Sequence, residues 1–415
     1  MAEPAGAFFR QQCWRGPEWV LLEKAGHTGR RNDATTARTM TKEHGAIEVS
    51  LAIADPPARS RCVVHFPDLT AADDDAAAIL HTCVIGAGGA FLLIAARLID
   101  PGDRYAVTDH FLYKAGPVAP SLHLLPEPYP IGIHAIHVGV LPLPRRGSPI
   151  TQLVGGVTLY KSWSKKKAAR MAPDMDERHL FFEHDKVFAV GDDALAWVDF
   201  RHGILMCQGI LGDDPVMRFI HLPPPMPTND TVNSDGSLPP LDTVRDVTFS
   251  HGSFRFVEME SHYLDSRIKD TQLRWTITVS KRMIGSESWD MQCTGLDSAN
   301  LTPASSCFPC LFPEIWDSRE NKLTLNKMIS FFSTLDQYHE NVVYIISMLP
   351  AHHQRHGCYW VLALDTKGRK LDKAVPFSAE PFFTPSFLQC AFSNYLSSAP
   401  VSRNPGSSVR HFNYG

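Results

Sequence analysis

The sequence predicts an all-β protein built mainly from antiparallel hairpins and arranged as a β-propeller-like body of six or seven blades with few short helices. Three observations predict this: strand-like runs recur along the whole chain, short turns separate them, and turn-forming residues are plentiful. The 415 residues include 27 glycines and 31 prolines, as many strands joined by turns require. So many hairpins must protect their edges, and closure into a propeller leaves few of them open. Two-sheet β-sandwich domains are the alternative arrangement.

The first half of the chain contains several short apolar runs with strand character. Strands are expected at residues 47–53, 62–65, 90–95 and 105–113. The longest apolar run, residues 83–96, contains three glycines. It is shorter than the ~20 residues that span a bilayer. We therefore expect a buried hairpin there, and no membrane association.

Hairpins are most clearly marked in the middle of the chain. Residues 186–190 and 194–198 flank a Gly-containing turn, and the second run is apolar on both faces, as in an inner strand. The turn at 250–252 separates two further apolar runs in the same manner. Residues 273–280 alternate apolar and polar side chains, a period of two that places one face in a core.

The last third predicts one helix between strands. Apolar residues at helical spacing predict a helix over residues 321–335, and strands are expected at 342–346 and 359–364. We expect three parts in the chain. They are an N-terminal segment (1–18), a single propeller-like domain (19–400) and a polar tail (401–415).

Composition excludes some classes of function. Hydrophobic residues make up 44% and charged residues 20%, as in ordinary globular proteins. A formal net charge of -4 argues against a general nucleic-acid binder, which needs a basic face. The nine cysteines are an odd number, and the N-terminus has no apolar signal segment. We therefore expect reduced thiols and an intracellular location, in the cytoplasm or the nucleus.

One cysteine pair is a weak zinc candidate. Cys307 and Cys310 with the downstream histidines 352, 353 and 356 offer the two thiolates and two imidazoles of a tetrahedral zinc site. However, 41 residues separate Cys310 from the first of these histidines, against about 12–15 in a compact zinc finger. We expect a pair of structural cysteines and no metal or cofactor.

Polar residues at predicted turns form a possible loop-surface site. These residues are Asp199, Arg201, His202, Asp246 and His251. Distant turns of a propeller meet at one mouth, where such side chains would assemble a catalytic or binding site. Turn formation and solvation explain the same residues without any chemistry. Since the chain has no Gly-x-Ser-x-Gly elbow or comparable motif, we assign no catalytic residue.

Four blocks of sequence resemble the signature of a plant family named only as domain of unknown function 1618. They span residues 197–207, 217–223, 245–248 and 256–259, within a signature region at about 195–260. Residues 19–22, 54–57, 376–380 and 391–396 also resemble the family, so the similarity extends from about Trp19 to about Pro400. The resemblance implies an intracellular plant protein of propeller-like shape, similar to the recognition part of F-box proteins.

The 18 residues before Trp19 are too few for an F-box. This argues against a direct ligase-adaptor role. The hairpin-rich architecture, the long loops and the absence of a catalytic set predict a non-enzymatic scaffold or recognition module whose partner is another protein. The alternative is an enzyme whose site assembles from loop Asp, His and Arg residues at a propeller mouth.

Overall fold

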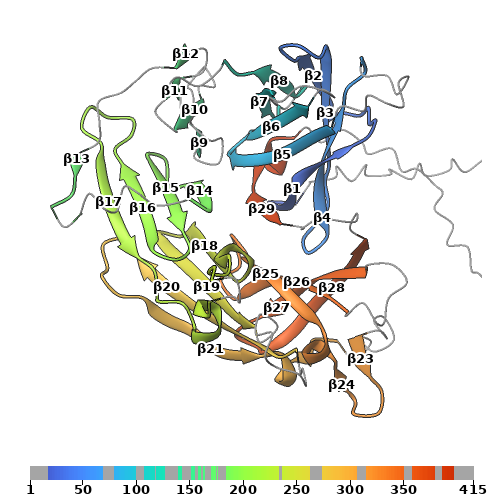
Figure 1. Ribbon diagram of the computed structural model, residues 1–415, viewed down its shortest axis with the longest axis vertical. Helices are drawn as coiled ribbons and strands as arrows, with labels where there is room; N and C mark the ends of the chain where they lie inside the picture. Colours follow the sequence, from blue (N-terminus) through green and yellow to red (C-terminus); the bar gives the residue numbers. More distant parts are fainter. Residues whose placement is uncertain are drawn as a thin grey trace, which may run out of the picture.

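The computed structural model is almost entirely β, which confirms the predicted fold class. In the part of the chain that the structure describes, the strands form six sheets, and the larger ones follow one another in chain order around a nearly closed ring (Figure 1). The structure describes residues 17–68, 79–99, 107–116, 118–126, 139–142, 151–154, 158–159, 162–163, 170–173, 175, 184–232, 236–261, 273–305, 315–349, 358–378 and 386–396. None of the helices in these residues has the length and apolar character needed to cross a bilayer.

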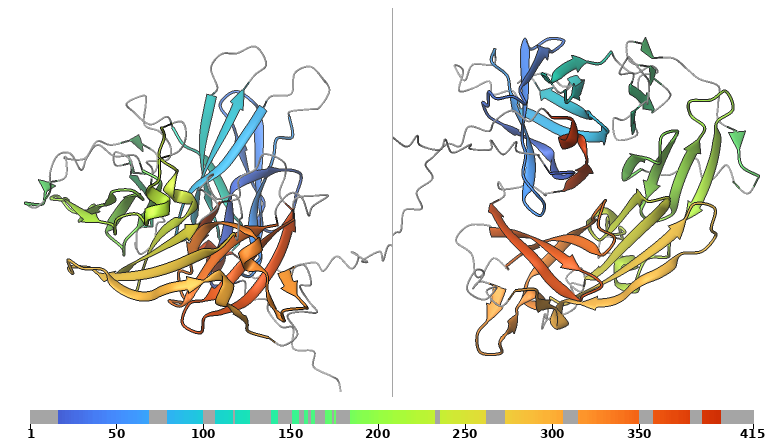
Figure 2. Two further views of the ribbon diagram at one scale, coloured as in Figure 1. Left: turned by 60° about the horizontal axis from the view of Figure 1, so that its bottom comes forward. Right: turned by 180° about the vertical axis from the view of Figure 1, so that it is seen from behind.

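The first sheet brings the two ends of the chain together. Its nine strands run in the order β2-β3-β4-β1-β5-β6-β7-β8, with β29 paired to β1. They are β1 (Val20–Thr28), β2 (Ala37–Met40), β3 (Ala46–Ala52), β4 (Arg59–His65), β5 (Ile79–Gly88), β6 (Phe91–Ile99), β7 (Val107–Lys114), β8 (Ser121–Leu124) and β29 (Phe387–Cys390). Figure 2 shows β29, in red, against the blue N-terminal strands. The Ser393 hydroxyl also donates to the Pro17 carbonyl (2.7 Å), which fastens the two ends.

The next two sheets form the left part of the ring in Figure 1. One has the order β12-β11-β10-β9 and the other the order β13-β17-β16-β15-β14. Their strands are β9 (Gly139–Pro142), β10 (Thr151–Val154), β11 (Thr158–Leu159), β12 (Ser162–Trp163), β13 (Arg170–Met171), β14 (Lys186–Ala189), β15 (Ala194–Asp199), β16 (Gly203–Gln208) and β17 (Val216–His221).

The remaining sheets complete the ring. Two have the orders β18-β19-β20-β21 and β22-β28-β27-β26-β25, and β23 pairs with β24. Their strands are β18 (Arg245–Ser250), β19 (Ser253–Ser261), β20 (Trp275–Met283), β21 (Asp290–Asp297), β22 (Thr302–Pro303), β23 (Trp316–Asp317), β24 (Lys322–Leu323), β25 (Ile329–Leu335), β26 (Val342–Met348), β27 (Cys358–Asp365) and β28 (Lys370–Ser378). Short 3-10 turns lie between strands: η3 (Pro227–Asp230), η4 (Leu241–Thr243), η6 (Ser298–Asn300), η8 (Leu325–Lys327) and η10 (Phe392–Tyr395).

The predicted hairpins are present, and their turns have the expected chemistry. All six residues of β15 are buried, as an inner strand requires. On β20 the side chains alternate between buried and half-buried through its first half. In the turn between β18 and β19, His251 and Gly252 have φ angles of 48° and 72°. Two successive positive φ angles define the turn that best matches the twist of a hairpin.

The predicted helix over residues 321–335 is wrong. This stretch forms β24, η8 and β25. The pairing of β25 with β26 shifts between Phe331 and Thr334, and Phe332 there has a φ of 52°. Such a bulge adds one residue to the strand, so buried side chains recur at an uneven spacing that imitates a helix. Leu325, Phe332 and Leu335 are all buried, the first in η8 and the other two in the irregular strand β25.

The main hydrophobic core extends through the sheets that contain β14 to β28, and a second core lies inside the first sheet. A buried ion pair crosses the main core. Arg245 Nη2 donates to Glu258 Oε2 (2.7 Å), and Arg245 Nη1 donates to the Phe200 carbonyl (2.6 Å). Glu258 Oε1 accepts from the Met226 N–H (2.7 Å) and the Asn229 amide (2.8 Å). This network joins the β15–β16 turn, η3 and the β18–β19 hairpin.

Candidate functional site

A pocket of about 540 Å³ lies where the start of β1 meets the loop before β4 and the β25–β26 turn. Strands β27 and β28 complete its wall with Ala363, Asp372 and Lys373. These segments are far apart in the sequence. The pocket forms where the first sheet packs against the last large sheet, since Trp19 and Tyr344 belong to one hydrophobic cluster.

The floor of the pocket is aromatic. Trp19 and Tyr344 both line it, and each is only 5% exposed. Their ring centroids lie 5.6 Å apart in a tilted arrangement, which is a favourable geometry for aromatic pairs. The floor is thus aromatic, and little of either ring is exposed.

Asp336 organises one wall of the pocket. Its carboxylate is 1% exposed, and Oδ1 accepts from the backbone N–H groups of Tyr338 (2.8 Å) and His339 (2.9 Å). Oδ2 accepts from the Tyr344 hydroxyl (2.8 Å) and lies 3.2 Å from His339 Nδ1. Burial and the charge of Asp336 raise the pKa of Tyr344, so the phenol stays protonated as the donor. The carboxylate thereby positions both the turn and the His339 ring.

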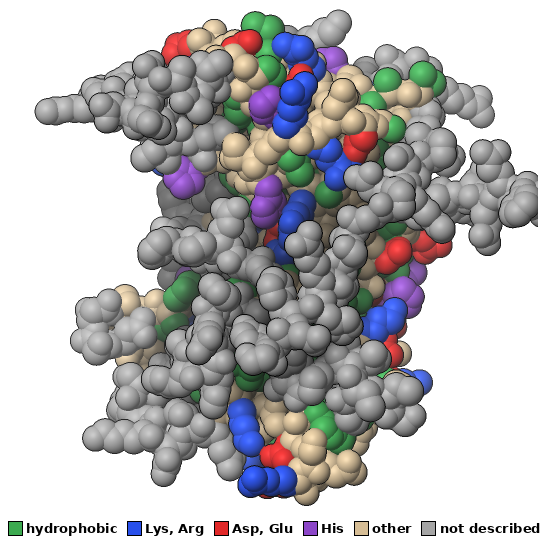
Figure 3. Space-filling view, turned by 90° about the vertical axis from the view of Figure 1, so that its right-hand side faces the viewer, with side chains coloured by type: hydrophobic (Ala, Val, Ile, Leu, Met, Phe, Trp, Pro, Cys, Tyr) green, Lys and Arg blue, Asp and Glu red, His purple; other side chains and the backbone are tan. Residues whose placement is uncertain are grey.

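The rim of the pocket is acidic. Glu18, Asp55 and Asp372 are exposed lining residues, and none of the three carboxylates has a hydrogen bond or ion pair with another described side chain. The basic lining residues are Lys373 and His339. Figure 3 shows the side of the molecule that is on the right in Figure 1, where acidic, basic and His side chains are intermixed rather than gathered by sign. Among the described residues, Glu18, Asp55 and Asp372 thus give the pocket an acidic rim.

Three of the residues predicted for a loop-surface site lie together in the β15–β16 turn. Asp199 Oδ1 accepts from the N–H groups of Arg201 (2.8 Å) and His202 (3.1 Å), and Oδ2 lies 2.6 Å from His202 Nδ1. Arg201 pairs with Asp230 (2.8 Å). Asp199 thus makes the same contacts as Asp336: it caps its own turn and orients the histidine three residues later.

The other two predicted residues lie apart from this turn. Asp246, near the start of β18, is buried; its Oδ1 pairs with Lys186 Nζ (2.6 Å), and its Oδ2 accepts from the Leu335 N–H (3.0 Å). His251 follows the opposite end of the same strand. The structure thus brings Asp199, Arg201 and His202 together, and the wider loop-surface site stays a prediction.

Cys307 and Cys310 lie outside the described residues. Among the residues that the structure does describe, there is no group of three or more His, Cys, Asp or Glu side chains that could hold a metal ion.

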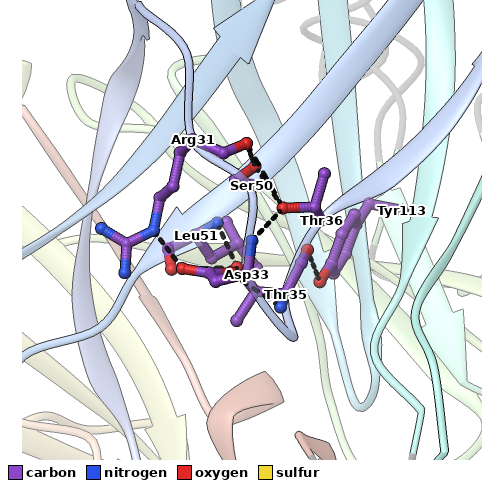
Figure 4. Close-up of polar contacts among 7 residues, drawn as sticks. All are labelled: Arg31, Asp33, Thr35, Thr36, Ser50, Leu51 and Tyr113. Carbon is purple, nitrogen blue, oxygen red and sulfur yellow. Dashed lines mark hydrogen bonds and ion pairs between the residues drawn. The ribbon is translucent and has the colours of Figure 1, made fainter. Parts of the chain in front are cut away.

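The loop between β1 and β2 contains a network of hydrogen bonds that holds the loop in place (Figure 4). Thr35 Oγ1 accepts from the Leu51 N–H (2.8 Å), and the Tyr113 hydroxyl donates to the Thr35 carbonyl (2.8 Å). Ser50 Oγ lies 2.9 Å from Thr36 Oγ1. Burial raises the pKa of Asp33, but hydrogen bonds from Thr35 outweigh it and leave that pKa lowered. These contacts fix the loop across β3 and β7.

The pocket residues Trp19, Asp336 and His339 were missed in the sequence. One signal was present: Asp336 and His339 have the same Asp-x-x-His spacing as Asp199 and His202, each at the end of a strand. The pattern predicts a capped turn that presents a histidine. It does not indicate that one of the two turns borders a pocket.

Comparison with known proteins adds a family likeness for the central part of the chain. Residues 197–344 match the family described as Protein of unknown function (DUF1618). This segment includes both Asp-x-x-His turns and the Arg245–Glu258 pair, so the likeness covers the centre of the fold. No curated protein matches the chain.

Proposed function

We propose that the protein is a non-enzymatic recognition module that binds a basic side chain of a partner protein in the pocket at the start of β1. The observation that carries this proposal is the rim of Glu18, Asp55 and Asp372 around an aromatic floor. A lysine or arginine places its apolar stem on such a floor while its charged end stays among carboxylates. The pocket volume of about 540 Å³ falls within the ~300–1,000 Å³ typical of ligand sites.

The energetics favour selectivity over high affinity. Each exposed carboxylate–cation pair contributes about 0.2–1 kcal/mol. Three such pairs therefore contribute about 0.6–3 kcal/mol and change binding by roughly threefold to a hundredfold, since 1.4 kcal/mol corresponds to a factor of ten. Affinity beyond that must come from contacts of the partner with the surrounding loops.

We also propose a fold and a cellular location for the protein that carries this pocket. We take the ring to be a six-bladed propeller. Strands β1 to β4 with β29 form one blade, and β5 to β8 form a second. The sheets of β9–β12, β13–β17, β18–β21 and β25–β28 give the other four. The resemblance of the sequence to a plant family with F-box-associated-like members supports a recognition role. An intracellular location is supported by the free thiols of Cys62, Cys83, Cys207, Cys293 and Cys390.

A titration with short peptides tests the proposed binding directly. Peptides that differ only in one central residue (Lys, Arg, norleucine or Glu) are added while the fluorescence of the protein is followed. We expect Lys and Arg peptides to bind more tightly than norleucine, and the Glu peptide not to bind. The variant E18Q/D55N/D372N should lose this preference.

The matched control carries the same change of charge away from the pocket. Asp192, Asp213 and Glu287 are exposed, and the variant D192N/D213N/E287Q should bind like the unmodified protein. Equal loss in both triple variants would attribute the effect to net charge and refute the pocket as the site.

A second candidate function rests on the orientation of His339. Its Nδ1 faces Asp336 while its side chain is 69% exposed, the arrangement that positions a general base in many hydrolases. If the protein hydrolyses an ester substrate and the His339→Gln variant does not, a hydrolase with His339 as its general base is favoured. Turnover that persists in that variant would exclude His339 as its base.

A further inference from the structure

The last turn of the described chain, η10, is bonded to two residues of the pocket. Ser393 Oγ donates to the Pro17 carbonyl (2.7 Å), and Asn394 Nδ2 donates to the Glu18 carbonyl (2.7 Å). Both acceptor residues line the pocket. The described chain therefore ends beside the acidic rim, and residues 397–415, here called the C-terminal segment, follow from that place.

The C-terminal segment has the charge that complements the rim. It contains Arg403 and Arg410 and neither Asp nor Glu. An apolar residue, Val409, directly precedes Arg410. The three carboxylates of the rim form no ion pair with a described side chain. An arginine with an apolar neighbour is the kind of residue that carboxylates around an aromatic floor bind.

The arginines of the segment are within reach of the pocket. An extended chain covers at most about 3.3–3.6 Å per residue. Arg403 is the seventh residue after Leu396, so the connection spans up to about 23–25 Å. This length exceeds the distance across a pocket of about 540 Å³ that begins at the neighbouring residues.

The other end of the chain complements the rim less well. Residues 1–16 precede Pro17 and contain Arg10 and Arg15, but they also contain Glu3. A carboxylate beside the acidic rim is repelled. Charge therefore favours the C-terminal segment as the occupant.

We propose that the C-terminal segment is an internal ligand of the pocket, which it enters with an arginine side chain. This inference rests on the proposed function, because the same three carboxylates would bind the basic side chain of a partner protein. The segment and the partner then compete for one site. The pocket accepts a partner only when the segment leaves it, so the segment sets a threshold for recognition.

The expected size of this competition follows from the tether. A ligand joined to its site by a short linker acts at an effective concentration on the order of mM. If the isolated segment binds with a Kd equal to that concentration, competition weakens external peptides about twofold, and a tenfold lower Kd weakens them about tenfold. Removing the two arginine charges should therefore tighten external binding by about twofold to tenfold.

The full-length variant R403Q/R410Q tests the inference with the Lys peptide and the fluorescence titration described above. We expect it to bind the Lys peptide about twofold to tenfold more tightly than the unmodified protein. The matched control R403K/R410K keeps both charges and should bind like the unmodified protein. A synthetic peptide of residues 397–415, added to R403Q/R410Q, should displace the Lys peptide.

Three results would overturn the inference. Equal Lys-peptide affinity of R403Q/R410Q and the unmodified protein would remove the segment from the pocket and leave the proposed function standing. A gain in R10Q/R15Q instead would assign the site to residues 1–16. A gain in R403Q/R410Q that disappears on dilution of the protein would place the segment in the pocket of a second copy. Failure of the Lys peptide to bind either protein would refute the proposed function itself.

Discussion

Removing the guanidinium of Arg245 should strongly destabilise the fold. The side chains of Arg245 and Glu258 are 0% and 2% exposed, and their closest atoms are 2.7 Å apart. In Arg245→Met the apolar stem still fills its space, but the Glu258 carboxylate remains buried with only two N–H donors. Breaking one side of a buried ion pair in this way costs about 3–5 kcal/mol. That is a large share of the ~5–15 kcal/mol that stabilises a typical domain.

Urea unfolding of this variant, followed by tryptophan fluorescence and by circular dichroism, measures the loss. Arg274→Met is the matched control, because Arg274 also pairs with a carboxylate, that of Asp297, but its side chain is 47% exposed. We expect the urea midpoint to fall far more for Arg245→Met than for Arg274→Met, with the slopes unchanged. Equal midpoints for the two variants would refute the claim that the buried network stabilises the centre of the ring.

Three further predictions follow from single side chains. Asp336→Ala removes the acceptor of two backbone N–H groups and of the Tyr344 hydroxyl, so thermal unfolding should show a loss of about 1–3 kcal/mol for each donor that stays buried. Because the folded pKa of Asp185, about 6, exceeds its ordinary 3.8, the unfolding free energy should fall as pH rises between these values; urea midpoints for Asp185→Asn should lack this fall. Burial raises the pKa of Cys62 to about 12 and of Cys207 to about 11, so iodoacetamide should alkylate both slowly until urea unfolds the chain, and fast labelling of the folded protein would contradict their burial.

Local patterns in the sequence predicted much of the fold. The alternation along β20, and the run of β15 that is apolar on both faces, were sufficient to predict these two strands. Successive side chains of a strand point to opposite faces regardless of what surrounds them. The bulge at Phe332 was not predictable in this way. The 3-10 turn η8 before β25 and one extra residue within β25 together spaced the apolar residues 325, 328, 332 and 335 as in a helix.

The pocket was beyond the reach of local patterns. Trp19, Asp55, Asp336 and Asp372 come from four separate segments. They meet only when the first sheet packs against the sheet of β25 to β28, and packing between sheets leaves no periodic signal in any one strand. The turn residues Asp199 and His202 were visible because their contacts lie within four residues of one another.

Selection of a random short-peptide library on the immobilised protein tests the proposed recognition most directly. We expect the enriched peptides to share one lysine or arginine beside apolar residues, and we expect the variant E18Q/D55N/D372N to enrich none of them. Enrichment of acidic or purely apolar peptides, or the same basic peptides on that variant, would contradict recognition of a basic side chain in this pocket.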